Sequence, residues 1–241
     1  MTGSYRTYYV NSETGRDTND GLTMEFPFAS LFPVNRLDLN PGDKVLLARD
    51  SVFAGQFLQI RSSGTKEQPI EIGSYSPEKE EGNPPLIAAD GQGIWYQDYG
   101  TPLDSPTHVY QGYVSSAVLL YDVKHVILRD LEITNRASGV PGESYSAPHK
   151  MNRTGVAVVA KDKGTCSGIT LRNLSIHDVN GNVYDKHMNN GGIYMTALKP
   201  ADEKVTGAAR FQDITVEGCF VYKVSRWGIA VGYTYAHDRF Q

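Results

Sequence analysis

A nine-residue pattern of alternating apolar and polar positions occurs three times along the chain, at residues 125–133, 168–176 and 213–221. Each copy predicts a short strand, a two-residue corner and a second short strand, because apolar residues recur at every second position on both sides of the corner. The apolar positions that match between copies are Val126, Leu128, Leu131 and Ile133, then Ile169, Leu171, Leu174 and Ile176, then Ile214, Val216, Cys219 and Val221. Repeats of this kind indicate stacked turns that share one continuous core.

The corner of each copy holds a residue that tolerates a left-handed backbone, namely Asp130, Asn173 or Gly218. Residues of these types adopt positive φ at low cost, which a tight bend between two strands requires. A local hairpin is the alternative for such a unit. We reject it because no strand of the repeat has a register-matched partner nearby in the sequence.

A third short apolar strand occurs once per repeat, at spacings of 38, 37 and 36 residues. Its first inward positions are Val118, Val156, Ile193 and Ile229, and its second inward positions are Leu120, Val158, Met195 and Val231. Stacking would bury each set in one row. We therefore predict an all-β fold, a right-handed parallel β-helix (a solenoid) whose rungs consist of three strands.

Loop length is the main difference between the repeats. Residues 135–154 and 177–191 both lead into the third strand, whereas residues 199–211 lie at another corner. Long irregular segments in a compact fold are commonly functional, so we expect the first two loops to wall one groove on the same face. Residues 91–113 show no clear strand period, and we interpret them as an insertion packed on the side of the solenoid.

The two ends of the chain differ in pattern. The first residues predict a strand, an Asx-rich turn and a Pro-Gly-Asp turn before the first rung, as an N-terminal cap requires. We predict a single domain over residues 1–241, with the cap at about 1–44 and rungs at about 45–241. No amphipathic cap follows the last strand, so C-terminal rungs or a cap are expected to be missing, and the uncapped end is expected to self-associate.

Several short motifs occur along the chain, at residues 8–10, 15–21, 27–31, 41–47 and 69–75 near the N-terminus and at residues 131–135, 176–181 and 191–194 in the repeats. These motifs resemble those of pectate-lyase-like right-handed parallel β-helix proteins. The nearest resemblance is to the group around glycoside hydrolase family 141. It implies a carbohydrate-active protein, a glycoside hydrolase acting on a plant or microbial polysaccharide. A polysaccharide lyase or epimerase on uronate glycans and a non-catalytic glycan-binding solenoid stay open as alternatives. In such proteins the catalytic carboxylates often lie in later rungs, so this chain is expected to be part of a longer enzyme and to lack the full active site.

Composition limits the partners. The net charge is −4 and no basic stripe is visible, so we expect no nucleic acid partner. No apolar run approaches the roughly 20 residues of a membrane span, so we expect no membrane partner. The chain shows no signal peptide, which leaves the protein either cytoplasmic or secreted with its signal removed. The expected partner is a polysaccharide or oligosaccharide.

A cofactor is not expected, although a lyase would bring in calcium. Asp17, Asn19 and Asp20 resemble the start of a calcium loop, but the position of the bidentate Glu holds no acidic residue. We therefore predict an Asx turn there and no metal site.

Aromatic and basic residues around the third strand are candidates for substrate binding. Tyr194 alternates outward and is predicted to lie exposed between the two long loops, where a sugar ring could stack on it. The alternative is that Tyr194 and Trp227 only cover the apolar rows and that the basic residues are plain solvated surface. The candidate substrate-binding residues are His149, Arg153, His187, Tyr194, Arg226 and Trp227.

Three residues in the loop 177–191 are candidates for catalysis. Asp178 and Asp185 could act as acid and base in glycoside cleavage. Lys186 could instead abstract the proton α to a uronate carboxylate, as a lyase requires. For Asp178 an Asx turn is the favoured alternative, and for Lys186 a solvated loop position.

Overall fold

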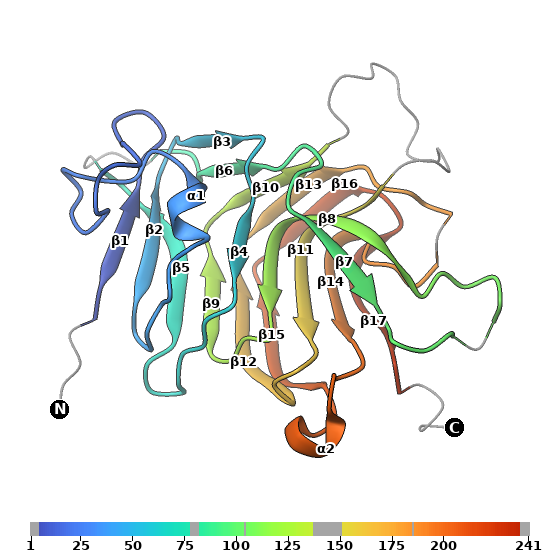
Figure 1. The fold of residues 1–241 in the computed structure, drawn as a ribbon. Coiled ribbons are helices and arrows are strands. Elements are labelled where there is room, and N and C mark those ends of the chain that lie inside the picture. Colours follow the sequence, from blue (N-terminus) through green and yellow to red (C-terminus); the bar gives the residue numbers. More distant parts are fainter. Residues whose placement is uncertain (1–4, 78–81, 104, 137–150, 185, 237–241) are drawn as a thin grey trace.

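The computed structural model describes residues 5–77, 82–103, 105–136, 151–184 and 186–236 (Figure 1). Seventeen strands and two four-residue helices make up these residues, so the predicted all-β class is confirmed. None of the helices in these ranges is long and apolar enough to cross a membrane. The helices are α1 (Leu31–Val34) and α2 (Glu203–Thr206).

The strands form three sheets in which neighbouring strands run parallel, except that β7 (Ile94–Asp98) runs antiparallel to β8. Sheet A contains β1 (Thr7–Val10), β2 (Lys44–Ala48), β5 (Ile70–Tyr75), β9 (Val126–Arg129), β12 (Thr165–Arg172) and β15 (Arg210–Glu217), in that spatial order. Sheet B contains β3 (Val52–Ala54), β6 (Leu86–Ala88), β10 (Glu132–Asn135), β13 (Ser175–Val179) and β16 (Phe220–Val224). Sheet C contains β4 (Leu58–Ile60), β8 (Gln111–Tyr121), β11 (Asn152–Ala160), β14 (Gly191–Ala197) and β17 (Trp227–Thr234).

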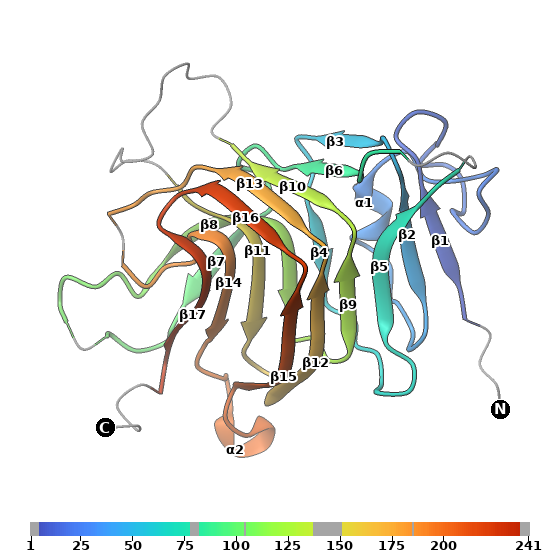
Figure 2. The same cartoon turned by 180° about the vertical axis from the view of Figure 1, so that it is seen from behind.

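The chain visits the three sheets in the same order again and again. After β2 it passes through β3 and β4, returns to sheet A in β5, and repeats this path until β15, β16 and β17 (Figures 1 and 2). Each pass therefore places one strand on the strand of the preceding pass. Apolar side chains from all three sheets meet in one buried cluster between them.

The predicted registers are confirmed in sheet C. Val156 aligns with Val118 and with Ile193, and Ile193 aligns with Ile229. The three-residue strand β4 extends the same rows at Leu58 and Ile60, which the repeat did not predict.

The corners also match the prediction. The φ angles of Asp130, Asn173 and Gly218 are 56°, 52° and 61°. These bends lie in the left-handed region, where Asp, Asn and Gly are the favoured residues.

One part of the predicted burial is wrong. Ile193 is fully buried, but Ile229 is 52% and Val231 is 75% exposed. Among the described residues, no strand pairs with the outer edge of β17, so nothing covers its apolar side chains. Alternation alone correctly predicted which side these residues occupy, but burial requires a strand on each side.

The N-terminal end is covered. The side chain of Ser30 accepts a hydrogen bond from the Phe32 amide at the start of α1, and Leu31 is buried. The Asp17 carboxylate accepts hydrogen bonds from the amides of Ala29 and Ser30, both at 2.9 Å. Asp17 thus ties its own turn to residues 12 and 13 positions away, while the predicted Asx turn occurs at Asp20, whose carboxylate accepts from the Leu22 amide at 3.0 Å.

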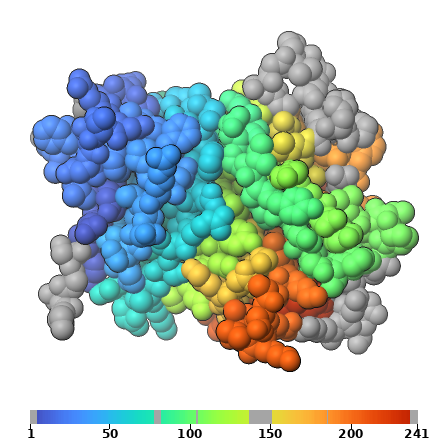
Figure 3. Space-filling view, viewed as in Figure 1, coloured from blue at the N-terminus to red at the C-terminus, as the bar shows by residue number. Residues whose placement is uncertain are grey.

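The segment 91–113 differs from the prediction because it contains a strand. Strand β7 (Ile94–Asp98) pairs antiparallel with β8 and lies over sheet C, where the hairpin forms part of the molecular surface (Figures 1 and 3). Trp95 and Gln97 point to the buried side, while Ile94 and Tyr96 are exposed. A polar residue on the buried side, Gln97, breaks the apolar alternation that would have revealed this strand.

Candidate functional site

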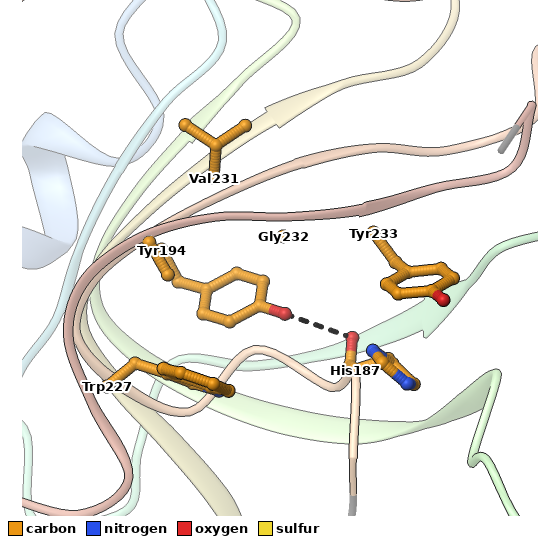
Figure 4. Close-up of a pocket in the computed structure, with 7 residues that line it drawn as sticks. His187, Tyr194, Trp227, Val231, Gly232 and Tyr233 are labelled. Carbon is orange, nitrogen blue, oxygen red and sulfur yellow. Dashed lines mark hydrogen bonds between the residues drawn. The ribbon is translucent and has the colours of Figure 1, made fainter. Parts of the chain in front are cut away.

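An open pocket of about 270 Å³ lies beside β14 and β17 (Figure 4). Strands β14 and β17 supply most of its wall, and one residue comes from the loop that precedes β14. The lining residues are His187, Tyr194, Trp227, Ala230, Val231, Gly232 and Tyr233. Three of the predicted substrate-binding residues, His187, Tyr194 and Trp227, therefore meet at one place.

Tyr194 lies on the side of β14 opposite to Ile193 and Met195, which belong to the buried cluster. It is not the exposed platform that we predicted, because only 2% of its surface is accessible. Its hydroxyl donates a hydrogen bond to the carbonyl oxygen of His187 at 3.4 Å (Figure 4). Burial raises the pKa of Tyr194 to about 12, so the hydroxyl stays protonated at neutral pH.

Gly232 gives the pocket its shape next to this tyrosine. A Cβ atom at Gly232 would lie 2.2 Å from Cε1 and 2.4 Å from the hydroxyl oxygen of Tyr194. Real Cβ atoms do not approach other atoms so closely, so a larger residue at this position would displace the Tyr194 ring.

His187 forms the opposite wall. Its ring centroid lies 3.9 Å from that of Tyr233 and 4.2 Å from that of His108. Its backbone has φ of 68°, an uncommon value for a residue other than glycine.

Trp227 is the most accessible aromatic side chain in the pocket lining, since 46% of the residue is exposed. The guanidinium carbon of Arg226 lies 5.6 Å from the centroid of the Trp227 ring. The Nη1 atom of Arg226 donates to the carbonyl oxygen of Val183. Arg226 therefore supports the tryptophan and the loop rather than lining the pocket.

Other predicted binding residues lie elsewhere. Arg153 is in β11, where its Nη1 atom donates to the carbonyl oxygen of Asn180 at 3.0 Å, and it does not line the pocket. Its sequence position in a long loop misled the prediction, because that part of the loop continues a strand of sheet C. His149 falls outside the described residues, as does most of the first long loop.

Asp178 belongs to β13 in sheet B, not to the loop where we placed it. His177 bridges two carboxylates, with Nδ1 at 2.6 Å from Asp178 and Nε2 at 2.9 Å from Glu132. Arg136 contacts the same Asp178 carboxylate at 3.0 Å. Burial alone would raise the pKa of Asp178, but the hydrogen bonds from His177 and Arg136 outweigh it and lower this pKa.

The left-handed φ of Asp178, 51°, fits the bend that we considered as the alternative to catalysis. Lys186 is exposed next to His187, and Asp185 lies outside the described residues.

The pocket lining is mostly aromatic. None of the described lining residues carries a carboxylate, an ammonium or a guanidinium group. In the described ranges, no group of three or more His, Cys, Asp and Glu side chains is placed to hold a metal ion. Such a lining can bind a flat, partly apolar ring by stacking, with the backbone and the Trp227 indole N–H as polar partners.

Sequence reasoning missed Tyr233 and Gly232 as pocket residues. Both residues come directly after Val231 in β17, so extending the predicted strand by two residues would have included them. It also missed strand β7, for which the sequence carries no periodic signal.

No family model matches the chain. Lacto-N-biosidase from Bifidobacterium longum subsp. longum is 39% identical over 97% of this chain, which covers 16% of that protein. Crystal structures of the glycoside hydrolase family 136 lacto-N-biosidase from Eubacterium ramulus superpose with a TM-score of 0.92 at 61% identity, covering 98% of this chain and 37% of theirs. A rhamnogalacturonan lyase has a TM-score of 0.52 at 16% identity, covers 89% of this chain, and shares the fold alone.

The likenesses to the two lacto-N-biosidases support a carbohydrate-active fold for this chain and do not show glycoside hydrolase family 141. The chain spans 16% and 37% of the length of the two lacto-N-biosidases.

Proposed function

We propose that the chain is part of a glycoside hydrolase that acts on oligosaccharides, and that the pocket beside β14 and β17 holds one sugar ring. The observation that carries this proposal is the likeness to lacto-N-biosidases, at 61% identity and a TM-score of 0.92 over 98% of the chain. The reaction in their name, release of lacto-N-biose, is therefore the activity that we propose for the enzyme containing this chain.

The pocket chemistry supports the binding role. The face of a pyranose ring carries C–H groups that pack on an aromatic ring, and Trp227 presents such a ring at the pocket wall. Tyr233 and His187 add two further flat surfaces close to each other. Contacts of this kind contribute about 1 kcal/mol each, by analogy with aromatic pairs.

The described lining holds no ammonium or guanidinium group, which favours a hydrolase over the alternative of a uronate lyase. A uronate carboxylate needs a cation or several N–H donors at its site, because burying an unpaired charge is costly. The guanidinium of Arg226 lies over Trp227 and donates to the backbone carbonyl of Val183. A non-catalytic glycan-binding protein would use the same pocket, so the enzyme assay decides between these two.

For the fold we propose a single right-handed parallel β-helix domain. The recurring path through three parallel sheets supports it. Connections between parallel strands are right-handed in about 98% of cases, which supports the handedness.

For catalysis, Asp185 stays a candidate acid or base from the sequence and lies outside the described residues, while Lys186, which precedes His187 by one residue, would serve only the lyase alternative. Asp178 is instead proposed as an ionised partner of His177 and Arg136 that holds the bend in sheet B. A glycosidase needs two carboxyl groups, so the proposed enzyme takes both of them from outside the described pocket lining.

Saturation-transfer NMR tests the binding role with the chain as it is. We expect lacto-N-biose to receive saturation from the protein and a uronate oligosaccharide to receive none. Binding of the uronate alone would overturn the choice of substrate class, and binding of neither would overturn the glycan site. Cleavage of a chromogenic lacto-N-bioside by the enzyme containing this chain, without the ultraviolet absorbance that elimination produces, separates hydrolase from lyase and from a pure binding protein.

A further inference from the structure

Three hydrogen-bond donors converge on one backbone carbonyl in the pocket wall, that of His187. The Tyr99 hydroxyl donates to this oxygen at 2.5 Å, the Gln97 side-chain amide at 3.3 Å and the Tyr194 hydroxyl at 3.4 Å. Gln97 belongs to β7, and Tyr99 is the residue that follows this strand. Both are far in sequence from His187, which lies in the loop that precedes β14. Both are fully buried.

The same two side chains hold the loop at further points. The Gln97 side-chain oxygen accepts from the backbone amide of Asn189 at 3.0 Å and from its side-chain amide at 2.5 Å. The Tyr99 hydroxyl also accepts a hydrogen bond from Thr196 of β14 at 3.0 Å. The Gln97 side-chain amide therefore both donates to and accepts from the loop, and Tyr99 links the loop to β14, the strand that carries Tyr194.

The backbone of His187 explains why such support is needed. His187 has a positive φ, its carbonyl oxygen accepts from Gln97 and Tyr99, and its ring centroid lies 3.9 Å from that of Tyr233. A non-glycine residue in this region persists only where the surrounding structure holds it. Burial raises the pKa of the Tyr99 hydroxyl well above its ordinary value, so this donor keeps its proton at neutral pH.

We propose that Tyr99 and Gln97 are positioning residues of the pocket, which hold His187 in its left-handed conformation and so place its ring in the wall. Neither residue lines the pocket, so they act through His187. Without Tyr99 or Gln97 we expect weaker sugar binding, and this consequence rests on the proposed glycan site. The placement of the His187 ring can be measured without any sugar.

The test uses Tyr99→Phe, which removes one hydroxyl, and Gln97→Met, which removes the amide at similar volume. Tyr75→Phe is the matched control, because it removes another buried tyrosine hydroxyl, at the N-terminal end. The chain has six histidines, so ¹³C-histidine labelling gives a simple NMR spectrum, in which His187→Gln identifies the His187 signals. We expect both β7 variants to move the His187 signals strongly, because its ring leaves Tyr233, and Tyr75→Phe to leave them in place.

Titration with lacto-N-biose then measures the consequence. We expect Tyr99→Phe and Gln97→Met to weaken binding about three- to tenfold, the range of one or two lost hydrogen bonds, and Tyr75→Phe to leave it unchanged. Unmoved His187 signals in both β7 variants would overturn the positioning role. If the unsubstituted chain binds no sugar, the proposed function fails, while the NMR shifts still decide on the positioning role. If one variant does not fold, the other gives the answer.

Discussion

Strands β14 and β17 carry aligned residues in different surroundings. Ile193 and Ile229 face each other in register, yet the first is fully buried and the second is half exposed. Met195 and Val231 repeat this contrast. The alternation of the two strands is the same, and the difference is that β14 has a described strand on both sides, whereas β17 has one on a single side. Burial in this fold thus comes from the neighbouring pass of the chain.

The pocket lies where these two environments meet. Strand β14 supplies the covered Tyr194, and β17 supplies the accessible Trp227 together with Gly232 and Tyr233. A substitution in β14 is therefore expected to act mainly on stability, and one in β17 mainly on binding or association.

The largest expected effect compares Ile193→Asp with Ile229→Asp. A carboxylate at position 193 would be buried between two strands, which should lower the free energy of unfolding by several kcal/mol or prevent folding. At position 229 the carboxylate reaches water, and we expect a loss below about 1 kcal/mol. Thermal and urea unfolding measure both variants, and similar losses in the two would contradict the proposed role of the neighbouring strand.

Tyr194→Ala should destabilise the protein as well as the pocket. Removing a buried aromatic side chain leaves a cavity, and such changes cost about 3 kcal/mol or more. We expect a fall in the urea midpoint with an unchanged slope. A variant as stable as the unsubstituted chain would mean that Tyr194 moves freely and that the 180–190 loop does not cover it.

A smaller effect concerns association. Apolar side chains of β17 are exposed, and no described strand pairs with the outer edges of β15, β16 and β17, so we expect self-association through these edges. Light scattering at increasing concentration should show dimers or larger species, and Val231→Lys should weaken association about tenfold by removing one apolar contact and adding charge. Val205→Lys on α2 is the matched control, because it makes the same change in charge at an exposed valine. A monomer at all concentrations would contradict this expectation.

The smallest effect separates two ion pairs on the outer face of sheet A. Glu71 contacts Arg129 at 2.5 Å and Lys44 at 3.0 Å and is largely covered, whereas Glu217 and Arg172 are both about half exposed. Burial would raise the pKa of Glu71, but Lys44 and Arg129 lower it below 4.5. The ionised Glu71 carboxylate therefore stabilises the folded state above pH 4.5, and this stabilisation is lost as the pH falls through the lowered pKa.

Glu71→Gln should cost about 1 kcal/mol at neutral pH and flatten the loss of stability in acid. Glu217→Gln should change stability by less than about 0.5 kcal/mol. Unfolding curves at pH 7 and pH 4 compare the two, and equal acid dependence in Glu71→Gln and the unsubstituted chain would contradict the assignment.

The rows and corners could be predicted because they depend on local rules. Period-two alternation identified the sides of the strands, and Asp130, Asn173 and Gly218 marked the bends. Strands β4 and β7 escaped prediction, since one has only three residues and the other buries Gln97.

The site was predicted only in part. The side of β14 that Tyr194 occupies follows from alternation, but its cover comes from His187 and from Tyr99, which is distant in sequence. Asp178 was assigned to a loop because its left-handed bend interrupts a strand that the sequence pattern ends at Ile176. Contacts between segments far apart in sequence leave no trace in a local pattern.

The most direct test of the account is the affinity of Trp227→Ala for lacto-N-biose, measured by calorimetry beside Phe32→Ala. Both residues are about half exposed aromatics, but Phe32 lies in α1 at the other end of the molecule. Loss of one stacking surface, worth about 1 kcal/mol, should raise the Kd about fivefold in Trp227→Ala, while Phe32→Ala binds as the unsubstituted chain does. Equal affinity of the two variants would contradict the claim that the pocket beside β14 and β17 binds the sugar.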